Sequence, residues 1–139
     1  MNSEKWHTAA TRGKGKSVPF KWHINDEKIT IQSDKMHHEY THTEILTALG
    51  WLQRRFKTSP FPLGNSVSKV GNETEKDGLG KALYSVKKDT TFAQRASYLG
   101  VVLEQMGIFE FVSHPITWQF AKKDQGTLDA IAQRLKTYR

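Results

Sequence analysis

The sequence of 139 residues contains no cysteine, which excludes disulfide bonds and thiolate metal sites and fits a reducing compartment. It also lacks any apolar run near the roughly 20 residues needed to span a bilayer. The N-terminus lacks the apolar region of a signal peptide. These absences predict an intracellular protein, cytoplasmic or nucleoid-associated, with no membrane contact.

Acidic side chains are in short supply. The sequence has 14 Asp and Glu against 21 Lys and Arg, which gives a formal net charge of +7 at pH 7 and a pI of about 9.7. Such a basic excess favours a polyanionic partner such as nucleic acid. The length suits one domain with a real hydrophobic core and leaves no room for a large enzyme.

The first 17 residues carry four basic side chains against a lone acid and offer almost nothing to bury. This composition predicts a flexible basic arm over residues 1–17, followed by a single domain over residues 18–139. Flexible cations contact phosphates rather than base edges. We therefore expect Arg12, Lys14 and Lys16 to add affinity for DNA with little sequence preference.

The next segments predict a hairpin and a helix. Apolar and polar residues alternate in "VPFKWHI" and "KITIQS", which indicates a β-hairpin that turns at Asn25–Asp26. Thr41 and Glu44 form a capping-box pattern, and apolar residues then recur at helical spacing as far as Phe56. A helix should therefore begin within a residue or two of Thr41.

The second half of the chain predicts further helices and a second hairpin. "GLGKALYSVKK" indicates a short helix, and "TTFAQRASYLGVVLEQMG" a strong one that Thr90 or Thr91 caps and Gly107 ends. "IFEFV" and "ITWQFA" flank the turn "SHP" and predict a hairpin. Thr127 should cap a short closing helix.

The order of these elements over residues 41–121 is helix, loop, short helix, helix and hairpin. This order resembles that of winged-helix (winged helix-turn-helix) DNA-binding domains, although the loop before "GLGKALYSV" is longer than the family usually has. The resemblance implies an α+β fold: a winged-helix-like helical core with a C-terminal wing hairpin, plus the N-terminal β-hairpin. In that family the last core helix lies in the major groove, and the wing touches the backbone or the minor groove.

The resemblance implies a non-enzymatic protein that binds double-stranded DNA without a cofactor. It gives a recognition helix over residues 91–106 and a wing over residues 108–121, and leaves a homodimer open. Arg and Gln on the helix face opposite Phe92 could pair with guanine and adenine, while the basic residues at element ends could contact phosphates. The expected DNA-binding residues are Thr91, Gln94, Arg95, Tyr98, Lys87, Lys88, His114, Arg12, Lys14 and Lys16. If these side chains have no such role they are simply solvated, and Tyr98 packs sideways against the core.

Residues 38–42 offer a different chemistry, because they spell His-Glu-x-x-His. A zinc-dependent hydrolase would use His38 and His42 as metal ligands and Glu39 as general base, with both histidines one turn apart on a helix. The capping box places His38 before the helix, and no convincing third ligand follows. The main interpretation therefore includes no metal site. The zinc hydrolase remains one alternative, and a protein-interaction module on a winged-helix scaffold is another.

Overall fold

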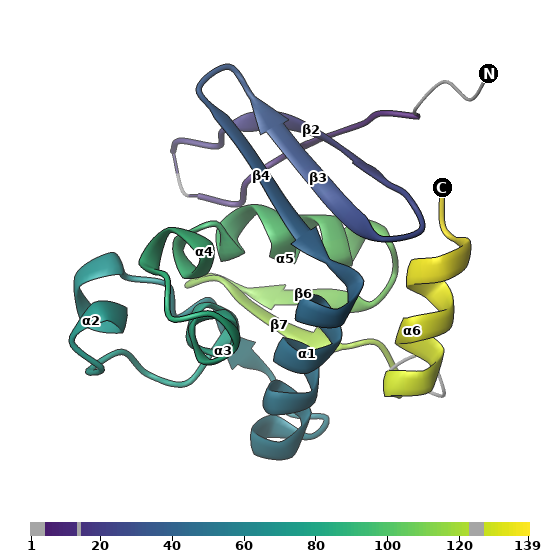
Figure 1. Ribbon diagram of the computed structural model, residues 1–139. Helices are drawn as coiled ribbons and strands as arrows, with labels where there is room; N and C mark the ends of the chain where they lie inside the picture. The colour runs from purple at the N-terminus through teal and green to yellow at the C-terminus, as the bar shows by residue number, and fades with distance from the viewer. Residues whose placement is uncertain (1–4, 14, 123–126) are drawn as a thin grey trace.

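An antiparallel four-stranded sheet opens the chain in the computed structural model, which describes residues 5–13, 15–122 and 127–139 (Figure 1). Its strands follow one another in chain order. They are β1 (His7–Ala10), β2 (Pro19–Ile24), β3 (Lys28–Ser33) and β4 (Met36–Thr41). Alternation along the strands turns Trp22, Ile31 and Tyr40 to one face, where all three are buried.

The predicted hairpin is present, but it is half of a larger sheet. Asn25 Oδ1 accepts hydrogen bonds from the backbone N–H groups of Glu27 at 2.8 Å and Lys28 at 2.9 Å, which closes the expected turn. Strand β4 was not predicted, since its sequence "MHHEYT" is mostly polar. It forms because it pairs along the whole of β3.

The prediction of a flexible arm over residues 1–17 is wrong for the part of it that the structure describes. Strand β1 pairs with β2, and His7 stacks on Trp22 with ring centroids 4.4 Å apart. The Thr11 N–H donates to the carbonyl of Val18 at 3.1 Å and closes the connection between the strands. Residues 1–4 and Lys14 lie outside the described residues.

Helix α1 (His42–Phe56) begins where the capping box predicted. The Glu44 N–H donates to Thr41 Oγ1 at 3.1 Å, and the Thr41 N–H donates to Glu44 Oε1 at 2.9 Å. The long segment that follows contains three short elements. They are β5 (Phe61–Pro62), α2 (Val67–Gly71) and α3 (Leu79–Val86), the last of which is the predicted short helix.

The strong helix predicted after Lys88 is two helices, α4 (Thr90–Gln94) and α5 (Ala96–Gln105). They meet at Arg95, whose ψ of 1° interrupts the regular helix. Asp89 caps α4 in place of the expected threonines, since its carboxylate accepts from the backbone N–H groups of Thr91 and Phe92. Gly107 ends α5 with a φ of 81°, as predicted.

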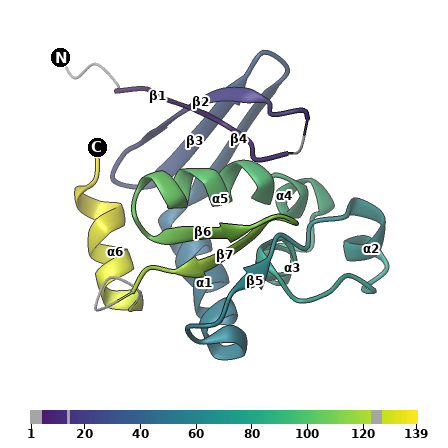
Figure 2. The same cartoon turned by 180° about the vertical axis from the view of Figure 1, so that it is seen from behind.

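The remaining elements form a second sheet and a closing helix. Strands β6 (Phe109–Ser113) and β7 (Thr117–Phe120) make the predicted hairpin, and β5 joins it in the order β5-β7-β6 (Figure 2). Helix α6 (Leu128–Thr137) is capped by Thr127, as expected. Over the described residues, no helix has the length and apolar character that a bilayer crossing requires.

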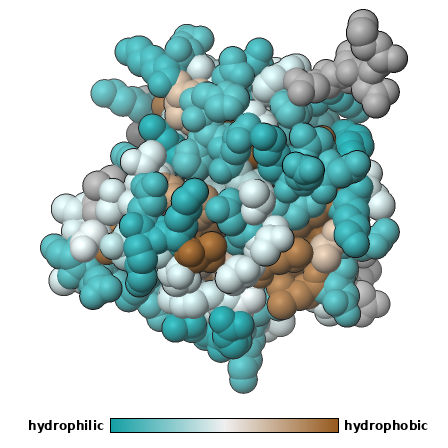
Figure 3. All heavy atoms as spheres, viewed as in Figure 1, coloured by the Kyte–Doolittle hydropathy of each residue, from teal (hydrophilic) through white to brown (hydrophobic). Residues whose placement is uncertain are grey.

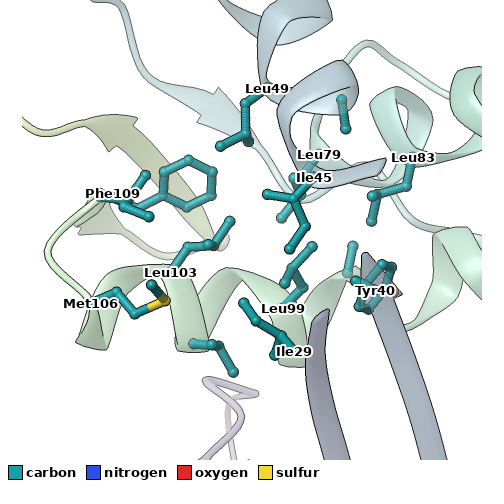
Figure 4. Close-up of a cluster of buried hydrophobic side chains, with 14 of the residues drawn as sticks. Ile29, Tyr40, Ile45, Leu49, Leu79, Leu83, Leu99, Leu103, Met106 and Phe109 are labelled. Carbon is teal, nitrogen blue, oxygen red and sulfur yellow. The ribbon is translucent and has the colours of Figure 1, made fainter. Parts of the chain in front are cut away.

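Helix α5 lies between the two sheets, at the centre of this mixed α+β fold (Figures 1 and 2). Figure 4 shows Leu99 of α5 close to Ile29 of β3 and Ile45 of α1. Helix α5 packs even more closely against the second sheet. A Cβ at Gly100 would lie 2.3 Å from the ring of Trp118, so only glycine lets the helix and strand β7 pack at this distance.

Candidate nucleic-acid interface

Several of the residues expected to bind DNA gather along one edge of the molecule. Helix α4, the β1–β2 connection, the β3–β4 turn and the β6–β7 turn all lie on the left in Figure 1 and on the right in Figure 2. Contacts join these segments. A cavity touches the start of β2, the β3–β4 turn and the α4–α5 junction, and Arg12 lies on the ring of Phe111 in β6. We call this the α4 edge.

Helix α4 presents polar side chains to solvent. Thr91 and Gln94 are exposed, and so are Lys87 and Lys88 just before the helix. Lys88 Nζ lies 5.1 Å from the ring of Tyr84 and has no ion-pair partner among the residues that the structure describes. Lys87 Nζ lies 3.9 Å from a carboxylate oxygen of Glu44, which is a loose pair between two surface groups. Four of the expected residues are therefore accessible here.

Helix α5, by contrast, is largely buried, and the prediction of one continuous helix over residues 91–106 is wrong because the chain breaks at Arg95. Its buried residues face both sheets; they are Ala96, Leu99, Gly100, Val101, Val102 and Leu103. Side-chain contacts hold the four-stranded sheet against it, and one of them is the hydrogen bond from Gln105 Nε2 to the carbonyl of Thr8 at 3.2 Å. Trp22 Nε1 donates to Gln105 Oε1 at 2.8 Å, and Phe20 meets Tyr98 edge to face at 5.1 Å. Tyr98 thus packs sideways against the core.

Arg12 is held in place instead of reaching out from a flexible arm. Its Nε donates to Glu104 Oε1 at 2.8 Å, and a second guanidinium nitrogen pairs with Oε2 of the same carboxylate. This bidentate pair raises the pKa of Arg12. Its guanidinium carbon lies 3.8 Å from the ring centroid of Phe111, whose ring in turn meets His114 at 5.2 Å. Because Glu104 balances its charge, Arg12 contributes little net attraction for phosphate.

Of the two other basic residues expected in the arm, the structure describes one. Lys16 is exposed in the β1–β2 connection, within the α4 edge. Lys14 lies outside the described residues. Lys35, in the β3–β4 turn, is an exposed cation at the same edge that the sequence did not suggest. It was missed because strand β4, which creates that turn, was not predicted.

Arg95 sits at the junction of α4 and α5, where its side chain is half-buried. Its buried Nε atom has no hydrogen-bond partner in the described part of the chain. Next to it is a cavity of about 350 Å³, which we call the Arg95 cleft. The polar residues lining the Arg95 cleft are Arg95, Tyr98, Ser33, Asp34 and Lys35. Arg95 therefore borders a gap between helix and sheet.

The histidines of residues 38–42 do not converge. His38 faces inward from β4, with its ring 4.7 Å from Tyr40 and 5.8 Å from Phe92. Glu39 lies on the opposite face of the strand, where Lys28 pairs with it at 2.9 Å.

His42 opens helix α1 and has different neighbours. Burial lowers its pKa, and the charges of Arg139 and Lys136 lower it further. The described residues hold no group of three or more His, Cys, Asp or Glu that could bind a metal ion. The expectation that His38 and His42 do not share a helix face is confirmed, and the geometry gives the zinc alternative no support.

A second cavity, of about 690 Å³, lies elsewhere. It opens between the end of α1, the end of β7 and the start of α6, and its apolar walls include Phe120, Ala121 and Leu128. Figure 3 shows apolar side chains near this region, and a second apolar patch on the same face. None of the residues expected to bind DNA lines this cavity.

No family model, curated protein or solved structure matches this chain.

Proposed function

We propose that this protein binds double-stranded DNA on a winged-helix-like scaffold, without a cofactor and without catalysing a reaction. The contact surface is the α4 edge. The observation that carries the proposal is the exposure of Thr91, Gln94, Lys87 and Lys88 on and beside one short helix, next to further cations from two other segments, Lys16 and Lys35.

The scaffold supports this proposal through the order of its elements. Helix α1, the short helix α3, the α4–α5 pair and the β6–β7 hairpin follow one another as in the family that the sequence resembles. Strand β5 pairs with β7 and so ties the hairpin to the segment after α1. The hairpin turn at Ser113–Ile116 then lies on the same edge as α4, where a wing could touch the DNA backbone (Figure 1).

Charge supports it as well. Lys16, Lys35 and Lys88 on this edge have no ion-pair partner in the part of the chain that the structure describes. The acids nearby are Asp34 in the β3–β4 turn, Asp89, which caps α4, Glu44, which lies near Lys87, and Glu104, which pairs with Arg12. Cations placed in this way attract the phosphate backbone of a duplex whatever its sequence.

The length of α4 sets how much sequence such a protein can read. Five residues make fewer than two helical turns, and only Thr91 and Gln94 offer exposed side chains that could hydrogen-bond base edges. The buried α5 contributes no reading residue. We therefore expect phosphate contacts to supply most of the affinity, with a modest preference between sequences.

A salt titration of duplex binding tests the proposal. Replacing both Lys87 and Lys88 by Ala should weaken binding to all duplexes alike. The slope of log K against log salt should become shallower by about 0.9 for each phosphate that the variant no longer neutralises. The matched control is Lys122→Ala with Lys136→Ala, which removes the same charge from exposed residues away from the α4 edge. Equally weakened binding in both double variants, or no salt-sensitive binding by the wild type, would overturn the proposal.

The cavity beside α6 favours a second candidate, a protein-interaction module. Leu128 is 37% exposed at its rim, which is unusual for a large apolar side chain of this protein. If DNA binding fails its test, this surface becomes the leading site for a partner. If two copies of the chain associate through this surface, Leu128→Lys should lower the mass measured by sedimentation from that of a dimer to that of a monomer.

A further inference from the structure

We infer that the Arg95 cleft binds a terminal phosphate group, a phosphomonoester such as the 5′-phosphate of a nucleic-acid strand or of a free nucleotide. The existence of the site rests on its own geometry. That the phosphate belongs to a DNA end rests on the proposed function.

The first argument is the state of Arg95. A guanidinium carries a permanent charge, and a buried charge is normally paired because leaving it unpaired is costly. Arg95 has no ion pair among the described residues, and its Nε–H is buried without an acceptor. An anion in the cleft would balance this charge. Arginine is also the side chain best suited to hold a phosphate through two parallel hydrogen bonds.

The second argument is what surrounds the cleft. Lys35 supplies a second cation, and Ser33 and Tyr98, which also line the cleft, carry hydroxyl groups that can donate hydrogen bonds. Asp34 also lines it and opposes an anion; Asp34 and Lys35 are both exposed in the turn, where water screens their charges, so the half-buried Arg95 contributes most of the attraction. Two cations against one exposed carboxylate leave the cleft attractive to a dianion.

The third argument selects a terminal phosphate over one within a strand. A phosphate monoester carries a charge of about −1.5 to −2 at pH 7, against −1 for a phosphodiester, so two cations favour the monoester. The cleft of about 350 Å³ is at the small end of ligand pockets, which span about 300–1,000 Å³. It has room for a phosphate with its sugar. A duplex backbone, with sugars on both sides of each phosphate, cannot descend to a half-buried guanidinium.

The site adjoins the α4 edge, which gives it a role in the proposed function. Arg95 directly follows Gln94, and Lys35 lies across the cleft from it. A duplex whose end rests on this edge could place its terminal phosphate in the cleft while Lys87 and Lys88 contact its backbone. The protein would then prefer ends with a phosphate over ends with a hydroxyl.

Two forms of one duplex, with a 5′-phosphate or a 5′-hydroxyl, test the inference by fluorescence anisotropy on the full chain. The phosphorylated form should bind about tenfold tighter, which is the low end for charge-assisted hydrogen bonds. Arg95→Gln should bring this ratio close to one. Lys35→Glu should reduce the ratio too. Because Lys35 lies in an exposed turn, this substitution should not disturb the fold. The control Lys87→Ala with Lys88→Ala should weaken both forms equally.

His38 gives an independent readout. Burial lowers its pKa, and the positive charges of Arg95 and Lys87 lower it further, against the opposite pull of Asp89 and Glu44. A dianion on Arg95 would offset that charge, so the His38 pKa, followed by NMR, should rise when the protein is saturated with a nucleoside 5′-monophosphate. The matching nucleoside without phosphate should leave it unchanged, and inorganic phosphate shows whether the phosphate alone suffices.

The outcomes separate the two proposals. Equal binding of both duplex forms, with no shift of His38, overturns the cleft and leaves the proposed function standing. Nucleotide binding that depends on Arg95, without binding of either duplex, supports the cleft and overturns the proposed function. If neither the duplexes nor the nucleotide bind, both fall.

Discussion

Helices α4 and α5 adjoin in the chain and have opposite surroundings. Helix α4 is five residues long, and its polar side chains meet solvent. Helix α5 is ten residues long and is covered by a sheet on each side, so it carries apolar residues around most of its circumference. Arg95 divides them. The two parts of one predicted helix therefore differ in role. Helix α5 stabilises the fold, and α4 has the side chains that are accessible to a ligand.

Truncating a side chain of α5 should therefore have the largest effect on stability. Leu99 is completely buried between the four-stranded sheet and α1. Leu99→Ala leaves a cavity there and should lower the free energy of unfolding by about 2–5 kcal/mol. Urea denaturation followed by circular dichroism measures this. At a temperature where the variant stays folded, its affinity for a duplex should match that of the wild type. A loss of affinity in the folded variant would mean that α5 contributes to binding as well as to stability.

The pH dependence of stability tests the α4 side, because His38 packs against Phe92 of α4. Its pKa is lowered in the folded protein, so the unfolded chain binds more protons as the pH falls below the usual value of about 6.5. Stability should therefore be present in full above that pH and decline from pH 7 to pH 5.

The variant His38→Gln isolates this contribution. Urea unfolding at pH 7.5 and at pH 5.5 should show a smaller decline for His38→Gln than for the wild type. Some decline should remain, because the pKa values of His7 and His42 are lowered as well. Identical declines in the two proteins would show that His38 ionises as easily in the fold as in the unfolded chain.

The smallest effect on stability is expected on α4 itself. The Gln94 side chain is exposed, and Gln94→Ala should change the free energy of unfolding by less than about 0.5 kcal/mol. Its effect should appear instead in the affinity difference between duplexes of different sequence, where a paired contact to adenine is worth about 1–3 kcal/mol. Gln133→Ala on α6 is the matched control and should alter neither quantity. An unchanged sequence preference in Gln94→Ala would mean that α4 reads no bases.

Elements with local causes could be predicted from the sequence. The cap at Thr41 needs only Glu44 three residues later, and the turn at Asn25 needs only its own side chain and the next backbone amides. Strands β1 and β4 depend on partners, since their own sequences are largely polar. No periodicity within "HTAA" or "MHHEYT" reveals a pairing with another strand.

The candidate site was predictable only in part, for the same reason. Exposure of Thr91, Gln94, Lys87 and Lys88 follows from the local pattern, and all four are exposed. The sheet over α5 is a tertiary contact, built largely by Phe20 and Trp22 from far along the chain. It could not be read from the helix itself, whose apolar stripe predicted only one buried face. Lys35 became a candidate only once β4 had formed its turn with β3.

The covering of α5 from both sides also bears on how the chain folds. Arg12 pairs with Glu104 across 92 positions of sequence, Trp22 with Gln105 across 83, and Arg139 with Asp26 across 113. Contacts between such distant residues require large loops to close before they stabilise anything, which slows folding. During synthesis, the four-stranded sheet leaves the ribosome well before the helix that its apolar face covers. The apolar face of the sheet stays exposed until more than a hundred residues have been made. It is therefore the part of the nascent chain most in need of protection from aggregation.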